Sequence, residues 1–415
     1  MALPESLGIP TRLQTFEATH QAALQRLDAI DPAAYARSRN TLDGAVTGLS
    51  PYFTHGLLSA PDAARAIHAH HALGFDDKLV FEFGWREFFH HVWAHQKNPD
   101  AILQDMHDAA VWRGRYADTL PLDIRQGCTG VAAIDNAVRI LYATGYLHNH
   151  LRMYLASYVV HVRKVHWRAG ADWLYGHLLD GDLASNHLSW QWVAGTFSSK
   201  PYLFNAENVL KYAPASAKAA WDSSGTVLDQ SYEALDRMAR NQTGTGPEPG
   251  VHEKLPEPPL LSHFYPLNYP LNWPSVQLKR SQNAIKNIAN KTLELVHPWS
   301  LSQPPTPDTL RIGIIDLPAH SVWPWSERRW QFVLQAMSAV TDSLWIGDLT
   351  ELDTSAARCV TAQATLFPGY RQALSNKAAL MPAPRLLPSP TMACRSFSKF
   401  YERARRDAGA FADLL

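Results

Sequence analysis

The spacing of apolar residues between positions 10 and 212 limits most strongly how this chain can fold. Apolar side chains recur there every three or four positions, as in the run Ile134, Val138 and Leu141, and strands with alternating polarity are absent. This period places apolar residues on one face of a helix. Residues 1–240 are therefore predicted to form a mainly α domain, with a break between two helices at Thr144-Gly145.

A proline-rich stretch follows the helical region. Segments such as NQTGTGPEPG and KLPEPPLLSHFYPLNYPLNWP cannot hold long helices, so residues 241–305 are predicted to be a linker that wraps a surface. One short helix is expected near Ser281–Leu295. In residues 306–415, LRIGIIDL and SLWIGDL are typical of buried parallel strands, and SERRWQFVLQAMSAV of the crossover helix between them.

The last segment is thus predicted to be a small α/β domain, whose role the sequence does not specify. Ligands in such folds bind at the carboxyl ends of strands. We therefore expect a crevice near Asp316–His320 and Gly347–Asp348.

Composition sets limits on the class of protein. The chain has 415 residues, 46% hydrophobic and 18% charged, which is typical of a globular protein with more than one domain. It has no long apolar run and no signal-peptide pattern, so we expect a cytoplasmic protein without membrane contact. A monomer is expected, although the sequence does not determine the oligomeric state. Three cysteines are too few for a disulfide framework or an iron–sulfur cluster. The net charge is zero, so any DNA partner must bind a local patch.

Polar residues interrupt the apolar helical faces in two neighbouring segments. Asn149, Arg152, Asp180, Asp182 and Asn186 lie among Leu, Met, Tyr and Trp residues. Burying an unpaired charge is costly, so these groups must pair with one another or with a polar ligand. A structural ion pair between Arg152 and Asp180 is one explanation, and a bound ligand is the other.

No metal site is predicted. The segment DGDLASN suggests a calcium loop, but Ser185 and Gln191 stand where such a loop needs glycine and glutamate. His91 and His95 lie one helical turn apart, yet HVWAH lacks the glutamate of a zinc protease motif. Both histidines are expected to be structural or solvated.

Four segments together resemble the photolyase and cryptochrome family. They are TGLSPYFTHGLLS (47–59), EFGWREFF (82–89), TGYLHNHLRM (144–153) and DGDLASNHLSWQW (180–192), in the family's order and roughly its spacing. The resemblance covers about residues 10–214. It is strongest to short bacterial photolyase-like proteins that lack the N-terminal α/β antenna domain, and whether an antenna pigment binds stays open.

The resemblance implies FAD as the cofactor. A turn of Thr, Gly and Ser residues that opens a helix offers hydroxyl and N–H groups to the FAD diphosphate. Val46 stands where the family usually has one more hydroxyl residue. The implied FAD-binding residues are Tyr35, Thr47, Gly48, Leu49, Ser50, Asn149, Arg152, Asp180, Asp182 and Asn186.

The same resemblance implies the residues that carry the photochemistry. Asn186 corresponds to the residue facing flavin N5, where a neutral amide is the photolyase type of choice. Trp190, Trp167 and Trp112 correspond to the chain of tryptophans that carries an electron from the surface to the excited flavin.

A further set corresponds to the family's substrate cavity and DNA contacts. Two tryptophans suit the faces of a flipped-out pyrimidine dimer, and arginines suit phosphates. The implied residues are Glu82, Trp85, Arg86, Asn149, His150, Met153, Trp192 and Arg39. His150 stands where the family commonly has Arg, so weaker duplex binding and a preference for single strands are expected.

The resemblance thus implies a deoxyribodipyrimidine photolyase, a carbon–carbon lyase that splits cyclobutane pyrimidine dimers in single- or double-stranded DNA with light. One alternative is a blue-light sensor of the cryptochrome type that does not repair DNA. Another is a helical module that binds single strands through Trp85 and Trp192. The third reading leaves the tryptophan chain and Asn186 without a role.

Overall fold

The computed structural model describes residues 3–107, 116–240, 244–248, 253–264, 288–302 and 309–415. It contains two compact units. The first comprises Met1–Phe16, Asp31–Gly48 and Gln96–Pro259, and the second Glu17–Ile30, Leu49–His95 and Leu260–Leu415. Neither unit is continuous in sequence, so they divide the chain differently from the three consecutive segments expected above.

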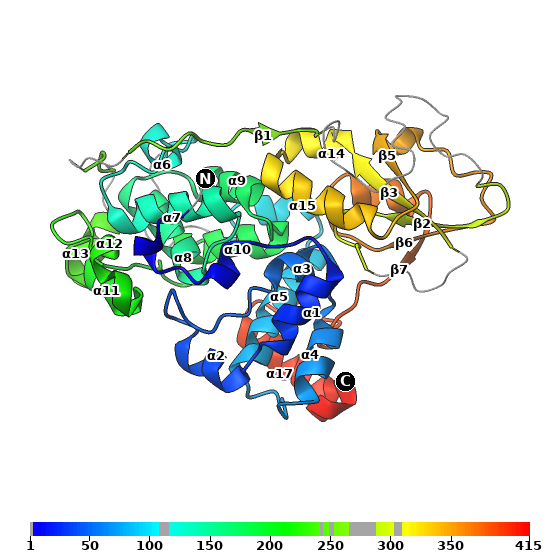
Figure 1. The fold of residues 1–415 in the computed structure, drawn as a ribbon, viewed down its shortest axis with the longest axis horizontal. Helices are drawn as coiled ribbons and strands as arrows, with labels where there is room; N and C mark the ends of the chain where they lie inside the picture. Colours follow the sequence, from blue (N-terminus) through cyan, green and yellow to red (C-terminus); the bar gives the residue numbers. More distant parts are fainter. Residues whose placement is uncertain (1–2, 108–115, 241–243, 249–252, 265–287, 303–308) are drawn as a thin grey trace. The chain divides into compact units, whose positions relative to one another are not determined.

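The first unit is helical (Figure 1). Its α-helices are α2 (Pro32–Ser38), α6 (Leu122–Arg125), α7 (Ala132–Thr144), α8 (Asn149–Ser157), α9 (Trp167–His177), α10 (Leu183–Ala194), α11 (Ala206–Tyr212), α12 (Lys218–Trp221) and α13 (Tyr232–Arg240). A π-helical turn, η4 (Tyr158–Val162), follows α8 directly. Short 3-10 turns are η1 (Glu5–Leu7), η2 (Thr11–Leu13), η3 (Pro99–Leu103) and η5 (Ala215–Ala217).

The core of the first unit lies among α7, α8, α9 and α10. The fully or almost fully buried residues include Ile134, Val138, Leu141, Leu151 and Leu155, which have the helical spacing expected from the sequence. α7 ends at Gly145, so the break predicted there is confirmed. The mainly α fold of this region is confirmed as well.

A glycine sets the distance between α9 and α10. A Cβ atom at Gly170 of α9 would lie only 2.3 Å from Cη2 of Trp190 on α10. Both faces of this contact are buried, and Trp190 is 2% exposed. The indole of Trp190 therefore lies directly on the backbone of α9, where only glycine leaves room.

We predict that Gly170→Ala lowers the free energy of unfolding. The added methyl group overpacks a rigid ring, which costs about 1–3 kcal/mol, and the higher helix propensity of alanine offsets about 1 kcal/mol of that cost. Urea denaturation measures the loss. Gly246→Ala is the matched control, because no atom lies within 4 Å of its added Cβ. A gain in stability of about 1 kcal/mol in Gly170→Ala, which is what helix propensity alone would give, would contradict the close contact.

The second unit combines helices with two sheets. Its helices are α1 (His20–Asp28), α3 (Ser50–Thr54), α4 (Ala60–His68), α5 (Lys78–Ala94), α14 (Leu317–Val322), α15 (Glu327–Ser338), α16 (Tyr370–Ser375) and α17 (Phe397–Ala408), with 3-10 turns η6 (Leu349–Glu351) and η7 (Phe411–Leu414). Its strands are β1 (Leu260–Leu261), β2 (Thr292–Val296), β3 (Leu310–Asp316), β4 (Trp325–Ser326), β5 (Ser343–Gly347), β6 (Cys359–Gln363) and β7 (Ala379–Met381).

The larger sheet is parallel throughout, with the order β5-β3-β2-β6-β7 (Figure 1). The predicted strands at β3 and β5, their parallel pairing and the helix α15 between them are confirmed. β2 lies where the sequence predicted the end of a short helix, and that prediction is wrong for residues 292–295. The alternating burial of TLELV suits a strand that pairs on both edges, whereas residues 281–287 of the expected helix lie outside the described residues.

The carboxyl ends of β3 and β5 are joined by a side chain. Asp316 accepts hydrogen bonds from the backbone N–H groups of Leu349 (3.0 Å) and Ala319 (3.3 Å). The strand order of the sheet reverses elsewhere, between β2 and β6, which is where doubly wound folds open their crevice. There the rings of Trp299 and Phe367 stack with centroids 4.1 Å apart. The place where a crevice was expected, beside Asp316 and Gly347, therefore lies away from the point where the strand order reverses.

The C-terminal segment packs along α5. The buried carboxylate of Glu87 accepts hydrogen bonds from the backbone N–H groups of Leu386 (2.6 Å) and Leu387 (2.9 Å), and burial raises its pKa to about 7. His91 accepts from the N–H of Cys394 at 3.0 Å, so this histidine has a structural partner. Among the described residues, no helix combines the length and apolarity that crossing a membrane requires.

Candidate FAD and electron-transfer site

Arg152 and Asp180 form a close ion pair in the first unit. Arg152 donates from Nη2 to Asp180 Oδ2 at 2.7 Å and from Nε to the carbonyl of Leu147 at 2.9 Å. The side chain of Asp180 is 2% exposed and that of Arg152 26%. α8 supplies the arginine, and the turn before α10 supplies the aspartate. The two residues that the sequence places together are therefore paired.

The first turn of α10 holds the next candidate residues. Asp182 is the N-cap of α10, and its carboxylate accepts from the N–H of Ser185 at 2.8 Å. The hydroxyl of Ser185 is buried and has no hydrogen-bond partner within the described residues. A polar ligand beside α10 would supply that partner, so the first turn of α10 suits a group rich in hydrogen-bonding atoms, such as FAD.

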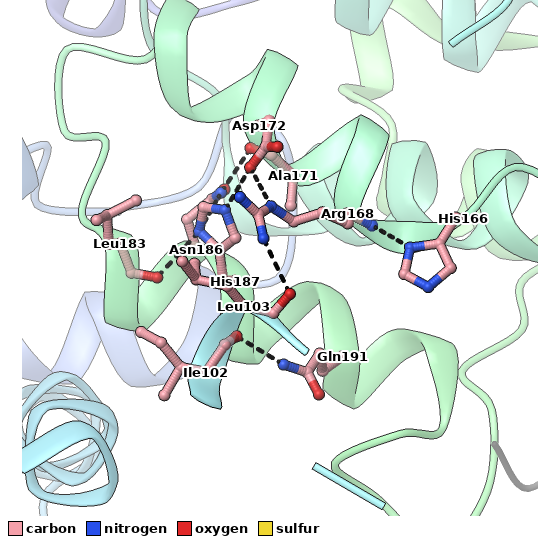
Figure 2. Close-up of polar contacts among 10 residues, drawn as sticks. All are labelled: Ile102, Leu103, His166, Arg168, Ala171, Asp172, Leu183, Asn186, His187 and Gln191. Atoms are coloured by element: carbon pink, nitrogen blue, oxygen red, sulfur yellow. Dashed lines mark hydrogen bonds and ion pairs between the residues drawn. The ribbon is translucent and has the colours of Figure 1, made fainter. Parts of the chain in front are cut away.

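Asn186 is fixed by the neighbouring helix. Its Nδ2 donates to the backbone carbonyl of Ala171 on α9 at 2.8 Å (Figure 2). His187, next to it, is bonded through Nε2 to Asp172 at 2.8 Å, and Arg168 donates to the same carboxylate oxygen at 2.6 Å. Burial lowers the pKa of His187, although Asp172 opposes this shift. The amide of Asn186 is thus held on a network of hydrogen bonds between α9 and α10.

The turn proposed for the FAD diphosphate begins in the first unit. Arg12 donates hydrogen bonds to the carbonyl groups of Gly44 and Val46, which fixes the backbone before Thr47. Gly48 is buried with a φ of 63°, a left-handed conformation that favours glycine. Tyr35 is also buried, on α2.

Leu49 and Ser50 belong to the second unit. Leu49 is fully buried, and its carbonyl accepts from the N–H of Tyr52 at 3.0 Å. Ser50 is the first residue of α3. The turn therefore continues directly into a helix, as the resemblance implies.

Two of the three tryptophans proposed for electron transfer are described. Trp167 begins α9, one turn before Gly170, and Trp190 lies on Gly170, so both indoles lie on the same stretch of α9. Each is 2% exposed. Trp167 donates from Nε1 to Asp105 Oδ1 at 2.6 Å. Trp112 lies outside the described residues.

The first unit also carries part of the proposed substrate set. Asn149 donates from Nδ2 to the sulfur of Met153 at 3.4 Å, one turn along α8. Trp192 is 37% exposed, with its ring 6.0 Å from that of Tyr202. Asn149 and Trp192 are exposed, and Met153 is half-buried.

His150 is a neutral group in this set. Burial, followed by the charge of Arg39, lowers its pKa to about 4. Its ring lies 4.7 Å from that of Tyr212. At neutral pH the positive charge at this point belongs to Arg39, a candidate contact to the DNA backbone that the family resemblance implies.

Glu82, Trp85 and Arg86 lie on α5 in the second unit. The indole of Trp85 stacks on the ring of Phe397 from α17, with centroids 4.1 Å apart and planes 6° apart. Phe397 therefore occupies one face of this indole. A base that stacks on Trp85 must use the opposite face.

Sequence reasoning missed several residues that hold the candidate side chains. Gly170 was detectable, because Ala-Gly-Ala next to a tryptophan marks a place where another element comes close. Asp105 and Phe397 left no signal, since their contacts join positions 62 residues and 312 residues apart. From the sequence, Asp172 and His187 could be recognised only as ionisable residues in two helices, and nothing indicated that they contact each other.

Comparison with known proteins identifies the family. A family model described as the FAD binding domain of DNA photolyase matches residues 79–286, which is half of the chain. The chain belongs to the photolyase and cryptochrome family. FAD is accordingly the cofactor of this domain, and the hydrogen-bonding groups around Arg152, Asp180 and α10 fit it.

Individual relatives match part of their length. A Streptomyces griseus protein named deoxyribodipyrimidine photo-lyase is 38% identical over 168 residues, which are 40% of this chain and 35% of that protein. A Synechococcus protein of the same name is 29% identical over 256 residues, 58% of this chain and 51% of the relative. A solved Synechocystis cryptochrome aligns with a TM-score of 0.44 and 22% identity, over 58% of this chain and 56% of the cryptochrome. The chain spans about half or less of the length of these two photolyases.

We predict that Arg152→Ala lowers the FAD content of the purified protein. The substitution leaves the carboxylate of Asp180 buried without its cation, which costs about 3 kcal/mol, the lower end of the range for broken buried pairs, because Arg152 is partly exposed. The ratio of flavin to protein absorbance measures the content.

Arg163→Ala is the matched control. It breaks another ion pair of the first unit, between Arg163 and Asp123 at 2.6 Å, whose side chains are 6% and 18% exposed. Both variants lose stability, but only Arg152→Ala is expected to lose flavin. Equal flavin content in the two folded variants would remove Arg152 from the FAD site.

Proposed function

We propose that this chain repairs cyclobutane pyrimidine dimers in DNA with blue light. The observation that supports this most directly is the arrangement of α8. Within one helical turn it carries Arg152, which pairs with Asp180 of the FAD set, and the bonded side chains Asn149 and Met153 of the substrate set. A light-driven repair enzyme needs its substrate beside its cofactor, whereas a sensor needs no such neighbour.

The protein's part in this reaction is to position the flavin and the dimer and to tune the flavin. FAD, when bound and reduced, supplies the excited electron that splits the dimer. Arg152 and Asp180 would present a fixed pair of charges to the cofactor, and Asn186, held by its hydrogen bond to Ala171, would offer it a neutral amide. No proton donor or metal ion is required for the splitting, so orientation and exclusion of water account for the protein's contribution.

We further propose that single-stranded DNA is the preferred form of the substrate. The chain has no net charge, and His150 is neutral at neutral pH because burial lowers its pKa to about 4. Duplex binding relies on phosphate contacts, and flipping a base out of a duplex costs free energy that a single strand does not require. Weak phosphate contacts therefore penalise duplex binding more than single-strand binding.

A second candidate is a blue-light sensor, which the stacking of Phe397 on Trp85 favours. This contact couples α17, near the C-terminal end of the chain, to a residue of the substrate set. In a sensor, a change at Trp85 would be passed to the C-terminal segment and its partners. The repair assay below decides between the two candidates.

We predict that reduced protein with bound FAD repairs a thymine dimer in a single-stranded oligonucleotide under blue light. Loss of the dimer is followed by chromatography, and the same sample kept in the dark is the control. A protein whose flavin is reduced by light but which leaves the dimer intact would fail as a photolyase, and the sensor function would then replace repair.

We predict that His150→Arg strengthens duplex binding and steepens its salt dependence by about one phosphate contact. The new guanidinium remains charged at neutral pH, unlike the imidazole that it replaces. Titrations of duplex and single-stranded DNA at several salt concentrations measure the slopes. His150→Gln is the control, because it keeps the position neutral and should leave the duplex slope unchanged. An unchanged slope in His150→Arg would show that position 150 does not face the DNA backbone.

A further inference from the structure

The indole N–H of Trp167 has a carboxylate partner. Nε1 of Trp167 lies 2.6 Å from Oδ1 of Asp105, which is in the range of the short, charge-assisted hydrogen bonds. The indole is 2% exposed, whereas the side chain of Asp105 is 44% exposed. Within the described residues, no carboxylate accepts the N–H of Trp190, the tryptophan that lies on Gly170. The two tryptophans therefore differ in what surrounds their indole nitrogen.

This difference matters once an indole has lost an electron. The cation radical of tryptophan is far more acidic at nitrogen than the neutral ring, so a carboxylate on that N–H both stabilises the positive charge and can take up the proton. We propose that Asp105 accepts the indole proton of Trp167 when Trp167 gives an electron to oxidised Trp190, so that the electron hole comes to rest on Trp167. This proposal rests on the tryptophan chain of the proposed function.

FAD, when bound, oxidised and excited by light, would supply the one-electron oxidant for Trp190, and oxidised Trp190 would then take one electron from Trp167. The N–H bond of Trp167 breaks and an O–H bond forms on Asp105, which gives a neutral indolyl radical and a carboxylic acid. An external thiol later returns one electron to Trp167, and the proton moves back from Asp105 to the indole nitrogen.

The other ionisable groups around Trp167 do not replace Asp105. His166 lies 3.9 Å from the same carboxylate oxygen, and its Nδ1 accepts from the N–H of Arg168, so it is held as a neighbour rather than as the acceptor of the indole proton. The guanidinium of Arg168 is neutralised by Asp172 at 2.6 Å.

Two further groups remain neutral at neutral pH. The ring of His187 is 6.2 Å from that of Trp167, and burial lowers the pKa of this histidine. Burial, followed by the charge of Asp105, raises the pKa of Tyr116 to about 12. Asp105 is thus the anion in direct contact with the indole, and its exposed side offers the proton an exchange with water.

The test compares Asp105→Asn with Asp105→Glu in the protein with bound FAD. Asparagine keeps an oxygen that accepts the indole N–H but removes the charge and the proton acceptor, whereas glutamate keeps both. Transient absorption after a blue flash distinguishes the cation radical of tryptophan from the neutral radical. We expect Asp105→Asn to leave the cation radical and to lower the yield of long-lived separated charge about tenfold, the factor that corresponds to about 1.4 kcal/mol.

Asp105→Glu is expected to restore the neutral radical, and the wild type to show slower radical formation in heavy water. Glu257→Gln is the matched control, because Glu257 accepts the indole N–H of Trp173 at 3.1 Å in the same unit. Its removal should leave the radical signals unchanged. A purely structural role of Asp105 would not produce a solvent isotope effect.

A second measurement needs no flavin. In the ¹⁵N-labelled apoprotein, the Nε1–H resonance assigned to Trp167 by Trp167→Phe should move upfield in Asp105→Asn, as the hydrogen bond loses its charged acceptor. An unmoved resonance, or a neutral radical of undiminished yield in Asp105→Asn, overturns the proposal. If Trp190→Phe and Trp167→Phe both leave photoreduction unchanged, the tryptophan chain itself fails, and that outcome is distinct from a failure of Asp105 alone.

Discussion

The close approach of α9 and α10 at Gly170 is the constraint on which the site depends. With no Cβ at that position, the ring of Trp190 lies on the backbone of α9. The same proximity lets Asn186 donate to the carbonyl of Ala171 and brings His187 to Asp172 (Figure 2). A wider spacing between the helices would break the contacts of both the amide and the indole at once.

The helical region and its polar residues were predictable from the sequence, because both depend on local spacing. Apolar residues three and four apart define the helices, and Arg152 and Asp180 stood out as charges in apolar surroundings. The strands β3 and β5 were predictable for the same reason. The assignment of photochemical roles came from the match to a family, since helical spacing alone does not distinguish a flavin site from a structural ion pair.

The features that escaped prediction depend on contacts between distant segments. β2 follows a proline-rich stretch, and its short run TLELV becomes a strand because β3 and β6 pair with it on both sides. Tertiary pairing overrides a local preference in this way whenever a segment is short. The contacts of Phe397 with Trp85 and of Asp105 with Trp167 likewise join segments that lie far apart in the sequence.

The helical spacing of side chains along α8 places a residue of the FAD set beside two residues of the substrate set. Residues 149 and 153 are four positions apart and so lie on one face, while residue 152 is three positions from 149 and lies beside them. Asn149 and Met153 therefore share a surface, and Arg152 extends next to it toward Asp180. Because all three side chains project from one helix, any shift that repositions the ion pair also moves the two residues proposed for substrate binding. This coupling suits the proposed repair function, in which an electron passes from the cofactor to the substrate.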